Sequence, residues 1–179
     1  MKTYVKSIAV LASICLVLAA LLGLVNMLTQ PVIEDAENRK VQAALAEVLP
    51  DTAFEKLSFV DYEGTVEFPS SVLEAYSADN GGFVFKLDVK GYSTGLVLLV
   101  GVNAEGRVSG SKVISSNETN GAENGYGDNL VGKTSDTVNS VATVSGSTLT
   151  TTAYKNAVKT ALDLAAALKP LITVKGANG

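Results

Sequence analysis

The stretch "FVFKLDVKGYSTGLVLLVGVNAEGRVSGSKVIS", residues 83–115, decides the fold class. Apolar and polar side chains alternate over residues 83–90, which is typical of a strand with one buried face. Residues 96–102 are almost entirely apolar, which favours a strand that is buried on both faces. The turn residues "NAEG" then separate this strand from the next one, at 107–115. The pattern predicts an antiparallel sheet in the middle of the chain.

Helices are expected on both sides of this sheet. Pro31 can begin a helix in which apolar residues recur at helical spacing over 41–49, and Pro50 would end it. A final helix is expected from near Thr150 to Pro170, with small residues at steps of about four along one face. The sequence therefore predicts an α+β fold in which helices pack against an antiparallel sheet.

The N-terminal region has the pattern of a membrane anchor. Residues 7–29 form an uncharged, mostly apolar run of 23 residues. As a helix, this run is long enough to cross a hydrocarbon core of about 30 Å. A cleaved signal peptide is the alternative, but its apolar region is shorter and ends in a small-x-small cleavage site. Cys15 lies in the middle of the run, where we interpret it as a small packing residue.

Charges on either side of this run indicate its orientation. Lys2 and Lys6 precede the run, whereas the first charges after it, Glu34 and Asp35, are acidic. The excess of basic residues on the cytoplasmic side of membrane proteins then places the N-terminus in the cytoplasm. We predict a single-pass protein of the cytoplasmic (inner) membrane. Residues 1–30 would hold the N-terminus and the transmembrane helix, residues 31–50 a helical stalk, and residues 51–179 an extracytoplasmic domain.

Composition excludes several classes of function. The chain has 14 basic and 18 acidic residues and a net charge of −4, which argues against a nucleic-acid partner. It has no histidine and one cysteine, which excludes a Ser-His-Asp triad, a metal site built from imidazoles or thiolates, and an intrachain disulfide. Any redox chemistry must therefore come from a bound cofactor.

A turn rich in hydroxyl groups precedes the final helix. Seven of the nine residues in "TVSGSTLTT", 143–151, are Ser, Thr or Gly. The N-terminus of a helix presents unpaired N–H groups and a partial positive charge, which suit a phosphate group. Gly146 permits close backbone approach, and the hydroxyls can donate hydrogen bonds or be esterified. An ordinary Ser/Thr helix cap is the alternative. The long Gly- and Asn-rich segment 116–139 is either a second functional loop or a flexible surface loop without a function of its own.

Several segments together resemble one protein family. The stretch "SGSTLTT", 145–151, resembles the SGATxTS motif of the FMN-binding domain in the G subunit of the Rnf ion-translocating electron-transport complex and in NqrC of the sodium-translocating NADH:quinone reductase. The apolar run ending in "LVNMLTQPVI" and the stretch 82–102 resemble the same Rnf protein. The segment "NETNGAENGYGDNLVGK" is similar to the ETPGLG segment of both proteins. The resemblance covers nearly the whole chain in the same order.

This resemblance implies a covalently bound FMN. A flavin transferase would attach FMN through its phosphate to the hydroxyl of Thr148, the last residue of the SGAT-like motif. Ser145, Gly146 and Ser147 would shape the phosphate seat. The other cofactor-binding residues implied by the two motifs are Leu149, Thr150, Thr151, Glu118, Thr119, Gly125, Tyr126 and Gly127.

Two positions differ from the family pattern. Ala142 occupies the position of an Asp three residues before SGAT, and that Asp belongs to the recognition pattern of the transferase. Asn120 replaces the Pro of ETPGLG, and an insertion relative to the motif follows it at 122–126. The sequence therefore predicts FMN binding more strongly than covalent attachment of FMN.

The function implied by the resemblance is electron transfer inside a membrane complex. The chain would be a flavoprotein subunit of an Rnf-type ferredoxin:NAD oxidoreductase coupled to Na⁺ or H⁺ translocation, and not an independent catalyst. Its partners would be the other subunits of the complex and the maturing flavin transferase. Three alternatives remain: a free-standing extracytoplasmic flavin carrier, a flavin-free scaffold or assembly subunit, and a binding module for another small ligand.

Overall fold

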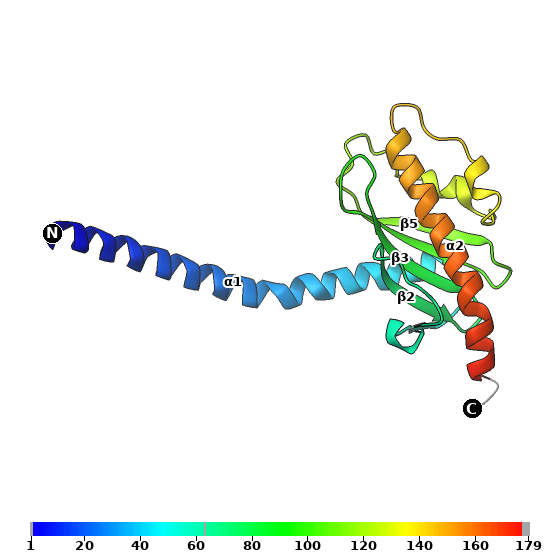
Figure 1. Ribbon diagram of the computed structural model, residues 1–179, viewed down its shortest axis with the longest axis horizontal. Helices are drawn as coiled ribbons and strands as arrows, with labels where there is room; N and C mark the ends of the chain where they lie inside the picture. Colours follow the sequence, from blue (N-terminus) through cyan, green and yellow to red (C-terminus); the bar gives the residue numbers. More distant parts are fainter. Residues whose placement is uncertain (1, 63, 177–179) are drawn as a thin grey trace. The chain divides into compact units, whose positions relative to one another are not determined.

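The computed structural model describes the backbone of residues 2–62 and 64–176. Within these ranges, it does not describe the side chains of residues 2–7, 9–10, 28–38 and 173–176. The chain divides into two compact units, Met1–Lys40 and Val41–Gly179. The first is helical, and the second holds the sheet with its covering helices (Figure 1).

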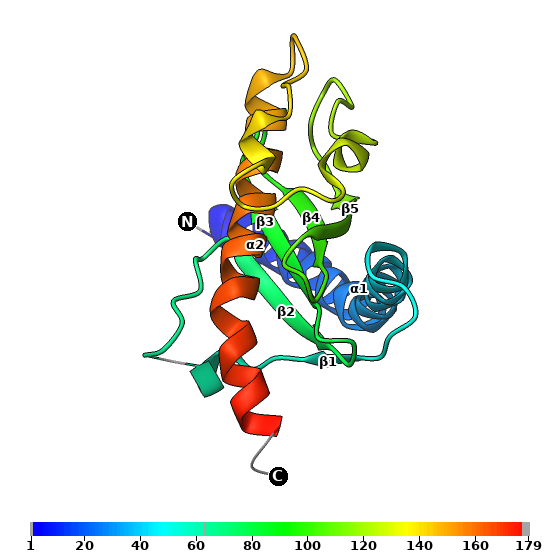
Figure 2. The same ribbon diagram turned by 90° about the vertical axis from the view of Figure 1, so that its right-hand side faces the viewer.

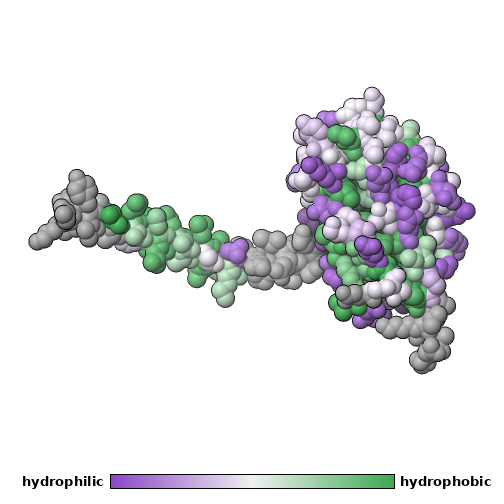
Figure 3. All heavy atoms as spheres, viewed as in Figure 1, coloured by the Kyte–Doolittle hydropathy of each residue, from purple (hydrophilic) through white to green (hydrophobic). Residues whose placement is uncertain are grey.

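Helix α1 runs from Lys2 to Val48, and its residues 2–40 make up the described part of the first unit. The large apolar side chains that the structure describes between Ile8 and Met27 are exposed, as Figure 3 shows along the helix. Among the residues described, none of the helices reaches both the length and the hydropathy required to span a bilayer. The predicted span, residues 7–29, also includes five positions whose side chains lie outside those described: 7, 9, 10, 28 and 29.

The prediction that a separate helix begins at Pro31 was wrong, because α1 continues through this position. A proline inside a helix removes one hydrogen bond and crowds the preceding turn. In this chain that local cost does not end the helix. The predicted end of the helix before Pro50 is confirmed, since α1 ends at Val48.

The second unit is built on a five-stranded antiparallel sheet in the order β1-β2-β3-β4-β5. The three predicted strands are confirmed as β3 (Phe83–Val89), β4 (Leu96–Val102) and β5 (Val108–Ser115). Two strands were not predicted, β1 (Phe54–Lys56) and β2 (Val72–Ala78). A short 3-10 helix, η1 (Phe59–Tyr62), follows β1.

Helices cover both faces of this sheet. On one face, Phe85, Leu98 and Val100 join a buried cluster with residues of α2, and Figure 2 shows α2 lying along the sheet. On the other face, Val84 and Leu99 pack against the last turns of α1, residues 41–48. Glycines allow this helix end to approach closely, since a Cβ built on Gly101 would lie 2.7 Å from the carbonyl oxygen of Val48. The predicted α+β architecture is confirmed.

Helix α2, Thr148–Gly176, begins two residues before the predicted start and runs past the predicted end at Pro170. Leu168 is fully buried, and Leu171 and Ile172 pack against the same core cluster. Burial of these apolar side chains on both sides of Pro170 offsets the cost of the proline.

The segment between β5 and α2 is anchored to the core. It contains two short 3-10 helices, η2 (Tyr126–Leu130) and η3 (Val138–Ser140). Tyr126, Leu130 and Val138 are buried in the main cluster, and the ring of Tyr126 meets that of Tyr154 in α2 edge to face at 5.5 Å. These contacts hold the long Gly- and Asn-rich segment against α2 near the turn that starts this helix.

Candidate functional site

A cavity of about 500 Å³ lies where the β3–β4 loop, the segment after β5 and the start of α2 meet. Figure 1 shows the start of α2 and the segment after β5 at the same end of the unit. The volume is within the range of cofactor pockets, roughly 300 to 1,000 Å³. The cavity brings together most of the predicted site residues; its lining is Tyr92, Glu118, Thr119, Asn120, Gly146, Ser147, Thr148, Leu149 and Thr150.

The hydroxyl-rich turn forms the first part of the site. Gly146 has a φ of 81°, a left-handed conformation that favours glycine. Thr151 completes the turn, because its N–H and its hydroxyl both donate to the carbonyl oxygen of Ser147 at 3.0 Å. The same hydroxyl accepts a hydrogen bond from the N–H of Val144 at 3.3 Å. The hydroxyl of Thr151 therefore stabilises the helix start and does not face the cavity.

Thr148 is the exposed hydroxyl of this helix start. It is the first residue of α2, and it lines the cavity. Thr150 and Thr151 are buried, whereas Thr148 is exposed. N–H groups in the first turn of a helix have no partner within the helix and carry partial positive charge. The turn thus places an accessible hydroxyl beside a site suited to an anion.

Glu118 connects the three segments of the cavity. Its carboxylate accepts hydrogen bonds from the N–H groups of Tyr92 at 3.2 Å and Ser93 at 2.9 Å, and from the hydroxyl of Thr150 at 2.5 Å. Burial opposes ionisation, but the hydrogen bonds from Thr150, Ser93 and Tyr92 outweigh it and hold the pKa of Glu118 below its ordinary value. Its charge therefore serves to join the β3–β4 loop to α2.

The junction between the β3–β4 loop and α2 requires a glycine at position 91. A Cβ built on Gly91 would lie 2.6 Å from Oε1 of Glu118 and 3.1 Å from the Cα of Thr150. The Cα of Thr150 belongs to the backbone of α2, so it cannot move away by a side-chain rotation. The close approach of the loop to the helix therefore depends on glycine at position 91.

Asn120 connects the ETPGLG-like segment to the turn. Its side-chain amide donates to the carbonyl oxygen of Gly146 at 3.1 Å and to the hydroxyl of Ser147 at 3.3 Å. A proline at this position has no side-chain donor. Asn120 therefore replaces the rigid proline of the ETPGLG motif by a residue whose side chain bonds directly to the turn.

Some predicted residues lie outside the lining of this cavity. Ser145 is exposed on the turn itself, and Gly125 precedes η2. Tyr126 is buried and donates from its hydroxyl to the carbonyl oxygen of Ala142 at 2.8 Å. Gly127 approaches Tyr154 and the strand β5 so closely that a Cβ would not fit. Of these residues, Tyr126 bonds to the backbone just before the turn, and Gly127 lies against Ser111 of β5 and Tyr154 of α2.

Tyr92 lines the cavity but was not predicted as a site residue. A signal for it was present, because an aromatic residue stands in the small-residue loop "GYSTG" that joins two strands, inside the stretch that resembles the family. A ring in such a loop is a candidate for contact with a ligand.

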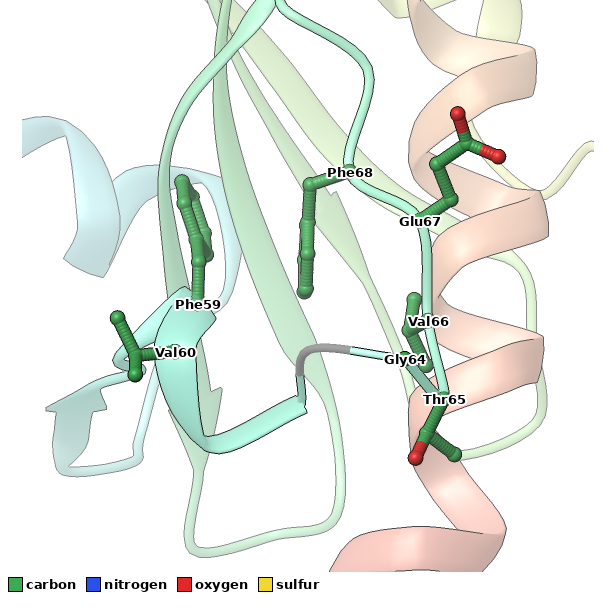
Figure 4. Close-up of a pocket in the computed structure, with 7 residues that line it drawn as sticks. All are labelled: Phe59, Val60, Gly64, Thr65, Val66, Glu67 and Phe68. Carbon is green, nitrogen blue, oxygen red and sulfur yellow. The ribbon is translucent and has the colours of Figure 1, made fainter.

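A larger cavity, about 740 Å³, lies beside η1 and contains no predicted site residue. It is lined mainly by apolar groups, including Phe59 and Phe68, whose rings stack with centroids 4.3 Å apart. Figure 4 shows the carboxylate of Glu67 pointing away from these rings. Ligand sites normally combine apolar walls with a few converging polar groups. The smaller cavity fits this description better.

Comparison with protein families agrees with the position of the smaller cavity. The FMN-binding domain matches residues 91–163, a range that contains every residue lining the cavity. The RnfG N-terminal region matches residues 1–48, which correspond closely to α1.

Individual proteins of known families are also similar to the chain. The G subunit of the Na(+)-translocating ferredoxin:NAD(+) oxidoreductase complex of Acetobacterium woodii is 30% identical, over 91% of this chain and 92% of the relative. The G subunit of the ion-translocating oxidoreductase complex of Stutzerimonas stutzeri is 30% identical, over 62% of this chain and 50% of the relative. The chain therefore belongs to the RnfG family, the G subunits of ion-translocating oxidoreductase complexes.

Proposed function

We propose that this chain is the FMN-carrying G subunit of an Rnf-type ferredoxin:NAD oxidoreductase. FMN is esterified through its phosphate to Thr148 and passes electrons between redox partners held by other subunits of the complex. The complex couples this transfer to Na⁺ or H⁺ translocation. The observation that carries the proposal is the position of Thr148, exposed at the start of α2 in a cavity that lies inside the FMN-binding match.

The residues of the cavity fit FMN. The first turn of α2 offers N–H groups and partial positive charge to the phosphate, and Gly146 and Ser147 line the cavity beside this turn. The hydroxyl of Thr148 is available for the ester bond. The exposed side chains of Tyr92 and Leu149 provide aromatic and apolar surface for the flavin ring.

In this proposal, FMN and the protein have different roles in electron transfer. FMN supplies one- and two-electron transfer when bound, and the protein supplies binding and orientation. The absence of histidine is compatible with this role, because the chain needs no acid, base or metal ligand of its own for the transfer. A tether at Thr148 keeps the cofactor in place outside the cytoplasm, where a lost FMN would not readily be replaced.

Expression with and without the family's flavin transferase tests the covalent bond. Protein made with the transferase should retain yellow-green flavin fluorescence in a gel after SDS denaturation, and protein made without it should lose the signal. Absence of flavin from both preparations, before and after denaturation, would favour the second candidate function, a flavin-free assembly subunit. The observation that favours this second candidate is Ala142, which replaces the acidic residue of the motif.

Restoring that acidic residue should increase flavin attachment. The side chain of Ala142 is exposed, and the hydrogen bond from Tyr126 is made to its backbone carbonyl, so Ala142→Asp should leave the turn intact. We expect Ala142→Asp to carry a severalfold larger fraction of covalent flavin than the wild type when the transferase is limiting. Ala142→Asn, of similar size without the charge, is the control. Equal labelling of all three proteins would show that the carboxylate is not needed.

The chain is anchored in the cytoplasmic membrane by residues 7–29, with the second unit outside the cytoplasm. The uncharged sequence of this run, the exposed apolar side chains along α1 and the RnfG N-terminal match at 1–48 support this proposal. The basic residues Lys2 and Lys6, which precede the run, support the orientation with the N-terminus in the cytoplasm.

Cysteine labelling tests this orientation, because Cys15 is the only native cysteine. In a Cys15→Ser background, Glu105→Cys, exposed in the β4–β5 turn, should react with a membrane-impermeant maleimide in intact cells. Thr3→Cys, which leaves Lys2 and Lys6 in place, should react only after the cells are permeabilised. The reverse pattern would contradict the orientation, and release of the protein by carbonate washing would contradict the anchor.

A further inference from the structure

The segment after β5 contains a buried carboxyl group that does not line the cavity. Glu123 is 3% exposed and belongs to the insertion at 122–126 relative to the ETPGLG motif. Its Oε1 accepts a hydrogen bond from the hydroxyl of Ser116 at 2.6 Å. Its Oε2 is the one buried side-chain oxygen or nitrogen without a hydrogen-bond partner in the part of the chain that the structure describes. Burial of an unpaired polar atom costs free energy, so stability alone does not explain a glutamate here.

The hydroxyl of Ser116 links this carboxyl group to Glu118. While it donates to Glu123, the same oxygen accepts a hydrogen bond from the N–H of Glu118 at 3.1 Å. The side chain of Glu118 in turn accepts hydrogen bonds from two N–H groups of the β3–β4 loop and from the hydroxyl of Thr150. A continuous series of hydrogen bonds therefore runs from Glu123 to the loop and to the first turn of α2.

The other end of this series is fixed by the core. The carbonyl oxygen of Glu123 accepts a hydrogen bond from the N–H of Tyr126 at 3.3 Å. Tyr126 is buried, and its ring packs against that of Tyr154 in α2. The backbone of Glu123 thus lies beside a residue that is anchored in the core, and Ser116 transmits this position to Glu118.

We propose that Glu123 is a positioning residue of the FMN site, which acts through Ser116 to fix Glu118 and thereby the β3–β4 loop. The effect on FMN rests on the proposed function, whereas the link between Glu123 and the loop does not require a cofactor. A side chain that bonds to two elements must itself be held in place, because a shift of its backbone would break one of these contacts. A site whose walls are already arranged for the ligand loses less entropy on binding. Because Glu123 belongs to the insertion, the ETPGLG motif itself does not supply this link.

Hydrogen–deuterium exchange of the full-length protein in detergent, made without the transferase, tests the link in the absence of flavin. Glu123→Ala removes the acceptor of the Ser116 hydroxyl, and Ser116→Ala removes the hydroxyl itself. In both variants, we expect peptides that cover residues 90–95 of the β3–β4 loop to exchange severalfold faster, and peptides of β4 to exchange at the wild-type rate. Glu123→Gln keeps a side-chain oxygen that can accept from Ser116, so it should restore slow exchange. Asn124→Ala, at the exposed neighbour of Glu123, is the matched control.

The same variants, made with the transferase, test the effect on the cofactor. Flavin content of the folded protein, measured by absorbance, should fall severalfold in Glu123→Ala and Ser116→Ala. Glu123→Gln and Asn124→Ala should retain most of the wild-type content. Adding Glu118→Ala to Glu123→Ala should lower the flavin content little further, because both changes break the same series of hydrogen bonds.

The outcomes separate this inference from the proposed function. Wild-type exchange of the loop in Ser116→Ala would overturn the inference, and so would exchange that rises equally in the loop and in β4, which indicates a general loss of stability. Faster loop exchange with unchanged flavin content would overturn the role of Glu123 in the FMN site. A wild type without flavin would overturn the proposed function, whereas loop exchange would still decide the link to Glu123. If Glu123→Ala does not fold, Ser116→Ala, which removes one oxygen from a half-buried side chain, decides the result.

Discussion

Thr148→Ala is expected to abolish covalent flavin on this chain. The hydroxyl of Thr148 is the exposed one at the start of α2, and without it the phosphate of FMN has no oxygen to which it can be esterified at this position. In a host that expresses the flavin transferase, the variant should show no flavin fluorescence in a gel after SDS denaturation. Intact-mass measurement should find the unmodified mass. Thr148→Ser keeps a hydroxyl and should retain part of the label.

Thr152→Ala is the matched control for this experiment. Thr152 is also an exposed threonine of α2, one turn further along, and does not line the cavity. Its labelling should equal that of the wild type. Label that persists in Thr148→Ala would mean that a different hydroxyl of the turn carries the ester, with Ser145 and Ser147 as the neighbours to test next. A wild type that never becomes labelled would contradict the covalent bond itself.

The central strands could be predicted from the sequence because their side chains follow the geometry of the sheet. In β3, Phe83, Phe85 and Leu87 alternate with residues of the other face, and the pairing with β4 keeps this register without interruption. In β2, buried residues do not alternate strictly, and the register shifts between Val72 and Glu74. A bulge of this kind moves side chains out of the two-residue period. This strand therefore had no clear pattern in the sequence.

The ends of the helices were predicted less well than the strands. A proline in the sequence predicts a helix end, but the burial of neighbouring apolar side chains can extend the helix beyond it. Pro170 predicts the end of a helix on local grounds. The burial of Leu168 and the packing of Leu171 against the core carry α2 beyond it. A sequence shows the proline but not the surface that compensates for it, so a boundary set by tertiary contacts lies outside local prediction.

The candidate site was partly predictable for a similar reason. The residues of the turn, from Gly146 to Thr150, are consecutive, and a motif of consecutive residues can be recognised in the sequence. Tyr92 and Gly91 reach the same cavity only through the fold, since Glu118 and Thr150 lie 26 or more positions away from Tyr92. Their contribution depends on the β3–β4 loop lying beside α2, a contact that no local pattern contains.

Glu118→Ala is expected to open the junction between the β3–β4 loop and α2. It removes the acceptor of hydrogen bonds from Tyr92, Ser93 and Thr150 and leaves the buried hydroxyl of Thr150 without that partner. Solvent screens this half-buried carboxylate, so we expect the free energy of unfolding to fall by only about 1 kcal/mol. The larger effect should be on the cofactor, with a severalfold lower flavin content in the folded protein. Chemical denaturation and flavin absorbance measure the two effects.

The pH dependence separates the charge of Glu118 from its size. Because the pKa of Glu118 is below its ordinary value of 4.5, its contribution to stability is fully present above that pH and is lost as the pH falls through the lower, folded-state pKa. Glu118→Gln has a similar size and no such titration, so its stability deficit relative to the wild type should be constant above pH 4.5 and should shrink below it. Glu105→Ala, at an exposed turn, is the control and should change neither stability nor flavin content. A deficit of Glu118→Gln that does not shrink in acid would show that the ionised carboxylate does not hold the loop to α2.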